Sequence, residues 1–497
     1  MLRRGGRRLA SAGIGLLAVG LMAQACSGGA PTPKAEGAPT FGASTSVVAA
    51  PWGGRGIVLW VGWSDLADMS DAELTAWHDH GVTAVVGQVQ YLTGMGGSNS
   101  FTGATPTPPG IEATLASSRI GERAKAAGIS SFLGFYFTDL QNTRTPLAEW
   151  FDNAAWTSSV LPKVEGVAAA ARELGFAGVA VDQELYPQDG RVRTATWNWS
   201  YPGNSHSQAA VRAEVVLRGR QLMQSLLAGF PGLSIVAYDT QLPGTWDAEI
   251  QAIDNGETGA YDDSVQINLW DGMTGVDGYG SILFLDADFY KTPGVSGASW
   301  NQSLAYEDRT VYPYLSKNLA NWSYAATHLS EAPFGWINSD GSDDAYGAAR
   351  PPAYVKDQLA SFRQWTTDGV FGVYNANSLD QAFYQPYYPA MDAATAPLLA
   401  PATKPSLQVR PVARPVLGSV DLSGEAADSD AIRFVLCATG GQKVVGAVMT
   451  RSGSTDPAVP DEVGWTCSRV PTDGGPVKVV ATDIRGVSTV VSVTPGR

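Results

Sequence analysis

Residues 175–187, GFAGVAVDQELYP, place two carboxylates directly after a short apolar run. A helix-like segment, VEGVAAAARELG, ends at Gly175, so the run that follows is predicted to be a β-strand. Side chains alternate between the two faces of a strand, which puts Ala180, Asp182 and Glu184 on one side. Burying two carboxylates together is costly unless they have partners or a chemical task. They therefore mark either a solvated strand end or a catalytic pair at the mouth of a barrel.

Seven further apolar runs resemble this one, and longer helical or loop segments separate them between about residues 55 and 400. Near-continuous apolar strands are typical of parallel sheets that are buried on both faces. Eight strand–helix units predict the α/β class and a (β/α)8 TIM barrel. A doubly wound open sheet is the alternative, but the chain has no G-x-G-x-x-G fingerprint and no P-loop. The predicted strands are residues 56–63, 83–90, 131–137, 177–182, 233–239, 264–270, 332–338 and 369–375.

The regions outside the barrel have different compositions. The amino terminus joins a basic segment, MLRRGGRR, to a short apolar one, as secretory signal peptides do. The carboxyl terminus contains short β-like segments separated by turn residues, which predicts a small β-sandwich of the immunoglobulin-like kind. The predicted domains are a signal peptide (1–25), a flexible tether (26–54), the catalytic barrel (55–400), a linker (401–415) and the β-sandwich (416–497).

The three cysteines bear on export and anchoring. Cys437 and Cys467 lie in the same small domain and can form a disulfide, which leaves Cys26 as the odd one. The leader can be cleaved at an A-x-A site, residues 23–25, for ordinary secretion. Alternatively, Cys26 after LMAQA resembles a bacterial lipoprotein box and would be lipidated. The cysteine count favours lipidation, so the expected location is the outer side of the cell membrane, or the medium if the protein is secreted.

Composition restricts the class of ligand. The net charge of −14 argues against nucleic acid and anionic membrane surfaces as partners. His78 and His80 fall on a predicted helix, where residues two apart do not share a face, so no zinc site is expected. We expect no metal and no cofactor, contact with a membrane only through a lipid on Cys26, and a monomer that binds a polysaccharide or oligosaccharide.

Acids, amides and aromatic residues recur at the carboxyl ends of the predicted strands, where TIM-barrel enzymes keep their reacting groups. Amides and acids bind hydroxyls, and aromatic rings stack on sugar faces. Some of these residues are expected to cap helices, and Ser64, Asp65 and Asp139 are the strongest candidates for that alternative. The predicted strand-end residues with a role in substrate binding or catalysis are Trp63, Gln90, Asp139, Asp182, Glu184, Tyr238, Asp239, Asn268, Trp270, Asp271, Trp336, Asn338, Tyr374 and Asn375.

The stretch FAGVAVDQE, residues 176–184, resembles the F-D-G-V-D-x-D-x-E signature of chitinase-like glycoside hydrolases of family 18. Ala177 and Ala180 replace its first two aspartates, while Asp182 and Glu184 match its last two acidic positions. The stretch INLWDGM, residues 267–273, echoes the family's M-x-Y-D segment, and Tyr374 stands where the family has a tryptophan. The resemblance implies a (β/α)8 barrel with this signature on its fourth strand, as predicted above.

The resemblance also implies roles for the acids. Glu184 would protonate the leaving-group oxygen, and the charge of Asp182 would raise the pKa of that acid. In the chitinase mechanism the substrate's acetamido group is the nucleophile, and Asp182 would orient it. Because Ala180 lacks the aspartate that supports this role, we favour a second protein carboxylate, Asp271 or Asp239, as the partner.

A long insertion, residues 186–208, follows this strand and contains Trp197 and Trp199. Long loops at the catalytic face are often functional, so these rings either stack on substrate or pin the loop to the barrel. The sequence predicts a secreted or lipid-anchored glycoside hydrolase that cleaves an extracellular polysaccharide or cell-wall glycan. The alternative is a non-catalytic glycan-binding lipoprotein that uses the same cleft.

Overall fold

The structure is a computed structural model, and it describes most of the predicted barrel and sandwich. The described residues are 52, 55–88, 109–136, 149–182, 199, 203–238, 263–286, 328–338, 351–362, 370–375, 384–399, 403–410, 415, 418–429, 432–439, 444–451, 461–472, 474–483 and 487–495. The predicted signal peptide, with Cys26, lies outside these residues. Among the described residues, no helix is both long enough and apolar enough to cross a bilayer.

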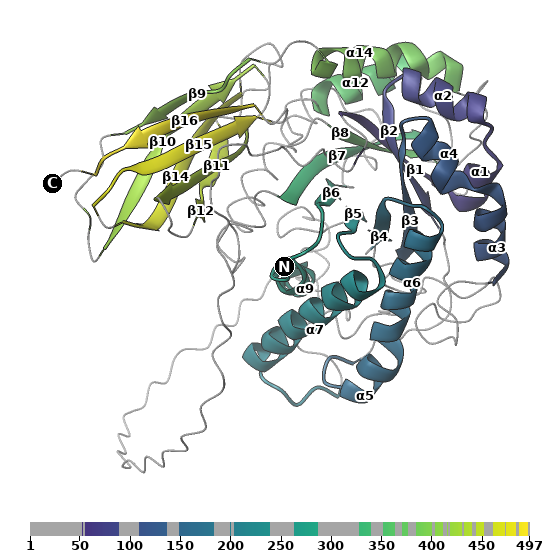
Figure 1. Cartoon of the computed structure of the whole chain (residues 1–497), viewed down its shortest axis with the longest axis horizontal. Helices are drawn as coiled ribbons and strands as arrows, with labels where there is room; N and C mark the ends of the chain where they lie inside the picture. The colour runs from purple at the N-terminus through teal and green to yellow at the C-terminus, as the bar shows by residue number, and fades with distance from the viewer. Residues whose placement is uncertain are drawn as a thin grey trace, which may run out of the picture. The chain divides into compact units, whose positions relative to one another are not determined.

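Eight parallel strands form a closed barrel, which confirms the predicted TIM-barrel architecture (Figure 1). Each strand pairs with the next one along the chain, and the last pairs with the first through Gly56 opposite Val370 and Trp60 opposite Tyr374. The strands are β1 (Gly56–Gly62), β2 (Val82–Gln88), β3 (Ser130–Tyr136), β4 (Gly178–Asp182), β5 (Ser234–Tyr238), β6 (Ile282–Asp286), β7 (Leu329–Asn338) and β8 (Val370–Asn375).

The prediction for the sixth strand is wrong. Residues 264–270 belong to the helix α9 (Asp263–Thr274), and β6 is formed by Ile282–Asp286. Val265, Leu269 and Met273 are fully buried and recur every four residues, which is the spacing of one face of a helix. The β-branched and aromatic composition of this stretch favoured a strand, but its apolar spacing is helical.

Helices surround the barrel. They are α1 (Trp63–Asp68), α2 (Asp71–Asp79), α3 (Pro109–Ser118), α4 (Ile120–Ala126), α5 (Asn153–Ala155), the π-helix η1 (Trp156–Val160), α6 (Leu161–Glu173), α7 (Gln208–Gly229), α9, α12 (Pro352–Phe362), the 3-10 helix η5 (Gln385–Tyr387) and α14 (Tyr388–Leu399). Ser70 begins α2 with a capping box, in which its Oγ accepts from the Glu73 N–H at 3.2 Å and the Glu73 carboxylate accepts from the Ser70 N–H at 2.7 Å. The sequence thus carries the start signal of α2.

Two aromatic pairs fill the barrel interior. Trp52 packs against Phe132 near the amino-terminal ends of the strands, with ring centroids 5.8 Å apart. Trp60 of β1 and Tyr238 of β5 meet near the carboxyl ends at 5.0 Å. These rings belong to one buried cluster with small and branched residues such as Ala180. Trp52 is fully buried, so the folded domain begins inside the predicted tether, 26–54.

The helices α7 and α9 cross at a glycine on each side. A Cβ atom on Gly219 would lie 2.0 Å from the carbonyl oxygen of Leu269, and one on Gly272 would lie 2.1 Å from the carbonyl oxygen of Val216. Real side chains do not approach backbone this closely, so the two backbones are in direct contact. This crossing fixes α9 against α7 on the outside of the barrel.

The carboxyl-terminal region forms two four-stranded antiparallel sheets, with strand orders β13-β14-β10-β9 and β12-β11-β15-β16. The strands are β9 (Ser406–Val409), β10 (Ser419–Asp428), β11 (Ile432–Thr439), β12 (Val445–Gly446), β13 (Val448–Arg451), β14 (Asp461–Pro471), β15 (Val477–Asp483) and β16 (Ser488–Val493). Buried residues of both sheets share one core, as in a sandwich. Because β9 pairs with β10, the sheet begins within the predicted linker, 401–415. The immunoglobulin-like topology stays a prediction.

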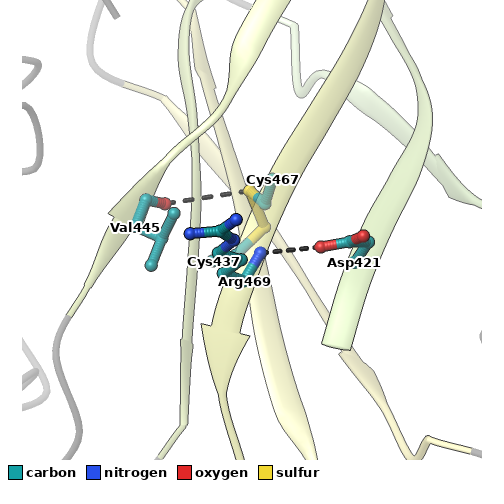
Figure 2. Close-up of a disulfide and its surroundings, with 5 residues drawn as sticks. All are labelled: Asp421, Cys437, Val445, Cys467 and Arg469. Carbon is teal, nitrogen blue, oxygen red and sulfur yellow. Dashed lines mark hydrogen bonds between the residues drawn. A yellow bond between two sulfur atoms is a disulfide. The ribbon is translucent and has the colours of Figure 1, made fainter. Parts of the chain in front are cut away.

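The predicted disulfide is confirmed. Cys437 on β11 and Cys467 on β14 are bonded across the two sheets with their Cα atoms 6.4 Å apart, and both are fully buried (Figure 2). Close by, Arg469 has a φ of 54° at a bulge in β14, where its backbone N–H donates to the Asp421 carboxylate at 2.7 Å. The bond joins strands whose cysteines are 30 residues apart in sequence.

We expect the paired substitution Cys437→Ala and Cys467→Ala to destabilise the carboxyl-terminal domain by about 3–4 kcal/mol, because the cross-link limits the unfolded chain. Calorimetry of the full chain should show that one transition moves to lower temperature, and a reductant should move the wild-type transition in the same direction. In a Cys26→Ala background, denatured protein should have no free thiol. Two free thiols per chain would contradict the pairing.

Candidate functional site

Strand register brings six of the predicted site residues to the carboxyl mouth of the barrel. Asp182 ends β4 and pairs with Tyr136 on one side and Tyr238 on the other. Trp336 pairs with Tyr374, and Asn338 pairs with Asn375. The positions of Asp182, Tyr238, Trp336, Asn338, Tyr374 and Asn375 at strand ends agree with prediction, and their roles in binding or catalysis stay predictions.

The Trp60–Tyr238 pair closes the barrel beneath this mouth. β1 and β5 lie on opposite sides of an eight-stranded barrel, so a ring distance of 5.0 Å means that the two side chains meet at the barrel axis. Both are buried, with 1% and 5% of their surfaces exposed. One face of the Tyr238 ring is thus occupied by Trp60. We call this pair the aromatic floor, and it lies beneath the strand ends that carry the predicted site residues.

The residue that caps α1 is not one of those predicted. Ser64 and Asp65 were expected to cap a helix, but α1 begins at Trp63, with Gly62 as its N-cap and no side-chain cap bond. Asp65 lies in the first turn instead, half-buried, and burial, followed by the charge of Asp68, raises the pKa of its carboxyl. Serine and aspartate are stronger capping residues than glycine, so the sequence favoured Ser64 and Asp65 over Gly62. A carboxyl with a raised pKa therefore lies directly after β1.

Three predicted residues do not lie at the mouth. Asn268, Trp270 and Asp271 are on α9, which packs against α7 outside the barrel. Trp270 is buried edge-on against Phe284, with ring centroids 5.1 Å apart, in the layer between strands and helices. Because residues 264–270 form a helix, the prediction that Asp271 ends a barrel strand, like Asp182, is wrong. Asn268 and Trp270 lie on the same helix and do not end a strand either.

Two roles were predicted for Trp199, stacking on substrate or pinning its loop to the barrel, and the structure agrees with the second. Only 7% of its surface is exposed, and the Arg212 guanidinium of α7 lies over its ring, 5.4 Å from the centroid. The Asn204 amide donates to the Trp199 carbonyl at 3.3 Å. A ring covered in this way pins its segment to the helices and does not offer a face to a sugar.

Arg218, on the same helix, holds the segment that follows β3. It is fully buried and donates to the Trp150 carbonyl at 2.8 Å and to the Asn153 Oδ1 at 2.6 Å. Its Nη2 lies 2.8 Å from the Glu214 carboxylate, and its guanidinium covers the Trp156 ring at 5.0 Å. Burial lowers the pKa of Arg218, while Glu214, Glu149 and Asp152 raise it.

Phe151 and His206 stack with centroids 3.6 Å apart and so join the segments that follow β3 and β4. With Arg212 and Arg218, this stack attaches both segments to α7 near the mouth. The chain enters residues 183–198 from the end of β4 and returns at the buried Trp199. Sequence reasoning missed this support, because an arginine inside an amphipathic helix is usually solvated.

Other predicted site residues cannot be placed. Trp63 begins α1, but its side chain is outside the described part of the structure. The residues that lie wholly outside the described ranges are Gln90, Asp139, Glu184, Trp197 and Asp239. Within the described ranges, no three His, Cys, Asp or Glu side chains come together as a metal site would require.

Lys163 is an unusual buried group on α6. Its side chain is 8% exposed, and its Nζ makes no hydrogen bond to any part of the chain that the structure describes. Burial lowers the pKa of this amine from 10.5 to about 8. Pro162, just before it, cannot donate a backbone hydrogen bond, and the Leu161 N–H reaches the Trp156 carbonyl in a π-turn. Pro162 and the π-turn account for the irregular backbone at the start of α6. The cost of burying the Lys163 amine has no compensating hydrogen bond among the residues that the structure describes.

No protein-family model and no curated protein matches the chain. Solved structures similar to it include a GH18 chitinase from Pseudoalteromonas aurantia, 11% identical with a TM-score of 0.36, over 68% of this chain and 99% of that one. A family 5 glycoside hydrolase from Prevotella bryantii B14, in complex with a xyloglucan tetradecasaccharide, is 9% identical with a TM-score of 0.40, over 70% and 97%. A GH5_18 enzyme from Streptomyces cattleya is 14% identical with a TM-score of 0.37, over 69% and 80%.

These structures are glycoside hydrolases of more than one family. Similarity at this level does not place the chain in any one of them. The specific resemblance of residues 176–184 to family 18 therefore stays a prediction.

We expect Lys163→Met to raise the free energy of unfolding at pH 7 by about 1–3 kcal/mol, because it removes a buried, unbonded polar group. Below pH 8 the amine is protonated in both the folded and the unfolded state. Burial of this charge then destabilises the folded state. Between pH 8 and 10.5 the unfolded state binds more protons, so wild-type stability rises with pH and the advantage of the variant shrinks. Chemical denaturation at pH 7 and pH 10 tests this, with Lys356→Met on exposed α12 as the control. A gain that does not change with pH would contradict the assignment.

Proposed function

We propose that this protein is an exported glycoside hydrolase that cleaves an extracellular polysaccharide or a cell-wall glycan at the mouth of its barrel. The observation that carries the proposal is the register of β4, which sets Asp182 between two tyrosines at the carboxyl ends of the strands. Glu184 follows two residues later. Around the same mouth, β7 and β8 end in tryptophan, tyrosine and asparagine, the residue types that bind sugar rings and hydroxyls.

In this proposal Glu184 is the general acid and protonates the oxygen of the leaving group. A carboxyl can do so near neutral pH when burial or a neighbouring negative charge raises its pKa. Asp182 supplies that neighbouring charge. The leader, residues 1–25, would export the enzyme, and a lipid on Cys26 would hold it at the cell surface with the barrel facing outward.

A non-catalytic glycan-binding lipoprotein is the second candidate. Ala177 and Ala180 stand where family 18 has two of its aspartates, and such losses are expected of a barrel that only captures sugar. The retained pair of Asp182 and Glu184 favours the enzyme. The two candidates differ in one measurable property, because both bind oligosaccharide and only one releases new reducing ends.

We expect Glu184→Gln to lower glycan turnover by about 10²–10⁴-fold, the usual contribution of a general acid, with little change in thermal stability. Release of reducing sugar from a panel of cell-wall and plant polysaccharides is the measurement. Glu173→Gln, at an exposed position at the end of α6, is the matched control and should retain wild-type turnover. A Glu184→Gln enzyme with full activity would remove this residue from the mechanism. Binding without hydrolysis by the wild type would favour the lipoprotein candidate.

We further expect the enzyme to cleave aryl glycosides that lack a 2-acetamido group, because Ala180 withholds the carboxylate that would support an acetamido nucleophile. Initial rates on matched substrates with and without that group measure this directly. Cleavage of the acetamido substrate alone, with tight inhibition by a thiazoline, would instead support the chitinase-type mechanism.

A further inference from the structure

The two sheets of the carboxyl-terminal sandwich end in four edge strands, β9, β12, β13 and β16. Natural edge strands avoid pairing with other chains by being short, or by carrying charge or proline. Three of these strands follow that rule. β12 has two residues, β13 has four and ends in Arg451, and β9 has four and lies between Pro405 and Arg410. β16 has six residues, STVVSV, with no charge and no proline, so its edge lacks this protection.

The far edge of β16 has no strand paired with it in the described part of the chain. β16 pairs with β15 on one side and ends its sheet on the other. β9 of the opposite sheet lies next to it (Figure 1), and the Thr489 hydroxyl donates to the Pro405 carbonyl at 2.5 Å. By alternation, Thr489 shares its face with Val493, which packs against the sandwich core. β9 therefore approaches β16 from the core side and leaves its edge open.

An aliphatic row crosses the outer face of this sheet and ends at the open edge. Leu436 of β11 pairs with Val480 of β15, and Val480 pairs with Val490 of β16. Residues that are opposite in antiparallel strands share a face, and this face points away from the core that Cys437 and Val479 enter. Leu436 is 3% exposed, whereas Val490 is 56% exposed, more than any other large hydrophobic residue that the structure describes. The row thus ends in an uncovered valine.

We propose that β16 is a docking edge for a second copy of this chain, whose β16 pairs with it antiparallel about a two-fold axis at Val490. In this register Val490 lies opposite the partner's Val490. Thr489 lies opposite the partner's Val491, and Ser488 lies opposite the partner's Ser492. Every pair joins residues of the same face, as the pleat of a sheet requires. The two aliphatic rows then become one, and Val490 lies in its middle.

The strand is complementary to itself. Because β16 has no charged residue, the two-fold axis brings no like charges together within the pair. The pairing uses the open edge of each copy, so it is isologous and stops at a dimer. One pair of six-residue strands buries little surface, so the dimer is weak and reversible. The monomer that the sequence predicted is then the form at low concentration.

Sedimentation velocity of the full chain with Cys26→Ala, at about 1–300 μM, should show a reversible monomer–dimer equilibrium, as expected of a small interface. Val490→Lys should raise the dissociation constant about 10-fold or more, because two like charges would lie directly opposite each other. Thr466→Lys, exposed on β14 between β10 and β13 of the other sheet, is the matched control and should associate like the parent chain. Both positions are exposed, so thermal melting should be unchanged.

Single cysteines in the same Cys26→Ala chain test the register. Opposite residues have Cβ atoms about 4.5–5.5 Å apart, so Val490→Cys should form a disulfide-linked dimer under mild oxidation. Ser492→Cys, which is also exposed, is the control. In the proposed register the two copies of residue 492 are four positions apart along the paired strands, about 13 Å, so this variant should stay unlinked.

Three results would each overturn the proposal: a monomer over the whole concentration range, equal association of Val490→Lys and the parent chain, or equal cross-linking of the two cysteine variants. Slow hydrogen exchange of the outward β16 amides in a monomeric chain would also overturn it, because another segment of the same chain would then occupy the edge. Species larger than a dimer would contradict the closed two-fold pairing. Glycan hydrolysis is measured separately, so the proposed function is tested independently of these outcomes.

Discussion

Pairing of β8 with β1 closes the barrel, and the other features of the mouth depend on that closure. A closed ring of parallel strands brings eight carboxyl ends together and directs alternate side chains to one axis. The interior is narrow, so residues from opposite strands meet there, as Trp60 and Tyr238 do. That contact sets the depth of the mouth. The strand ends above it carry polar residues at one end of the barrel, although these residues come from segments far apart in sequence.

Much of the barrel could be predicted because its strands are buried on both faces. β4 was placed within one residue of its observed start, since Gly175 ends the preceding helix and an apolar run follows at once. β6 was missed for a physical reason. Residues 264–270 have the composition of a strand, but the spacing of Val265, Leu269 and Met273 buries one face of a helix. The residue types in this stretch favour a strand and the spacing of its apolar residues favours a helix, and the structure agrees with the spacing.

The candidate site was less accessible to sequence reasoning. Residues at strand ends, such as Asp182 and Tyr374, could be found because the position of a strand fixes where it ends. The environment of Trp199 could not, because its cover comes from Arg212 on a helix that begins nine residues later. Asp65 was expected to cap a helix, but α1 begins earlier, with Gly62 as its N-cap. The cover of Trp199 is a contact between elements, which a local pattern does not encode.

The glycine crossing between α7 and α9 has a consequence for how this protein can evolve. Because the contact joins backbone to backbone, no rotamer can absorb an added methyl group, and only separation of the helices would make room. α7 carries the arginines that hold the segments after β3 and β4, and α9 packs Trp270 against β6. A shift of α7 would therefore disturb the segments after β3 and β4, and a shift of α9 would disturb the packing of Trp270 on Phe284. Relatives that share this barrel should therefore change Gly219 and Gly272 together or keep both.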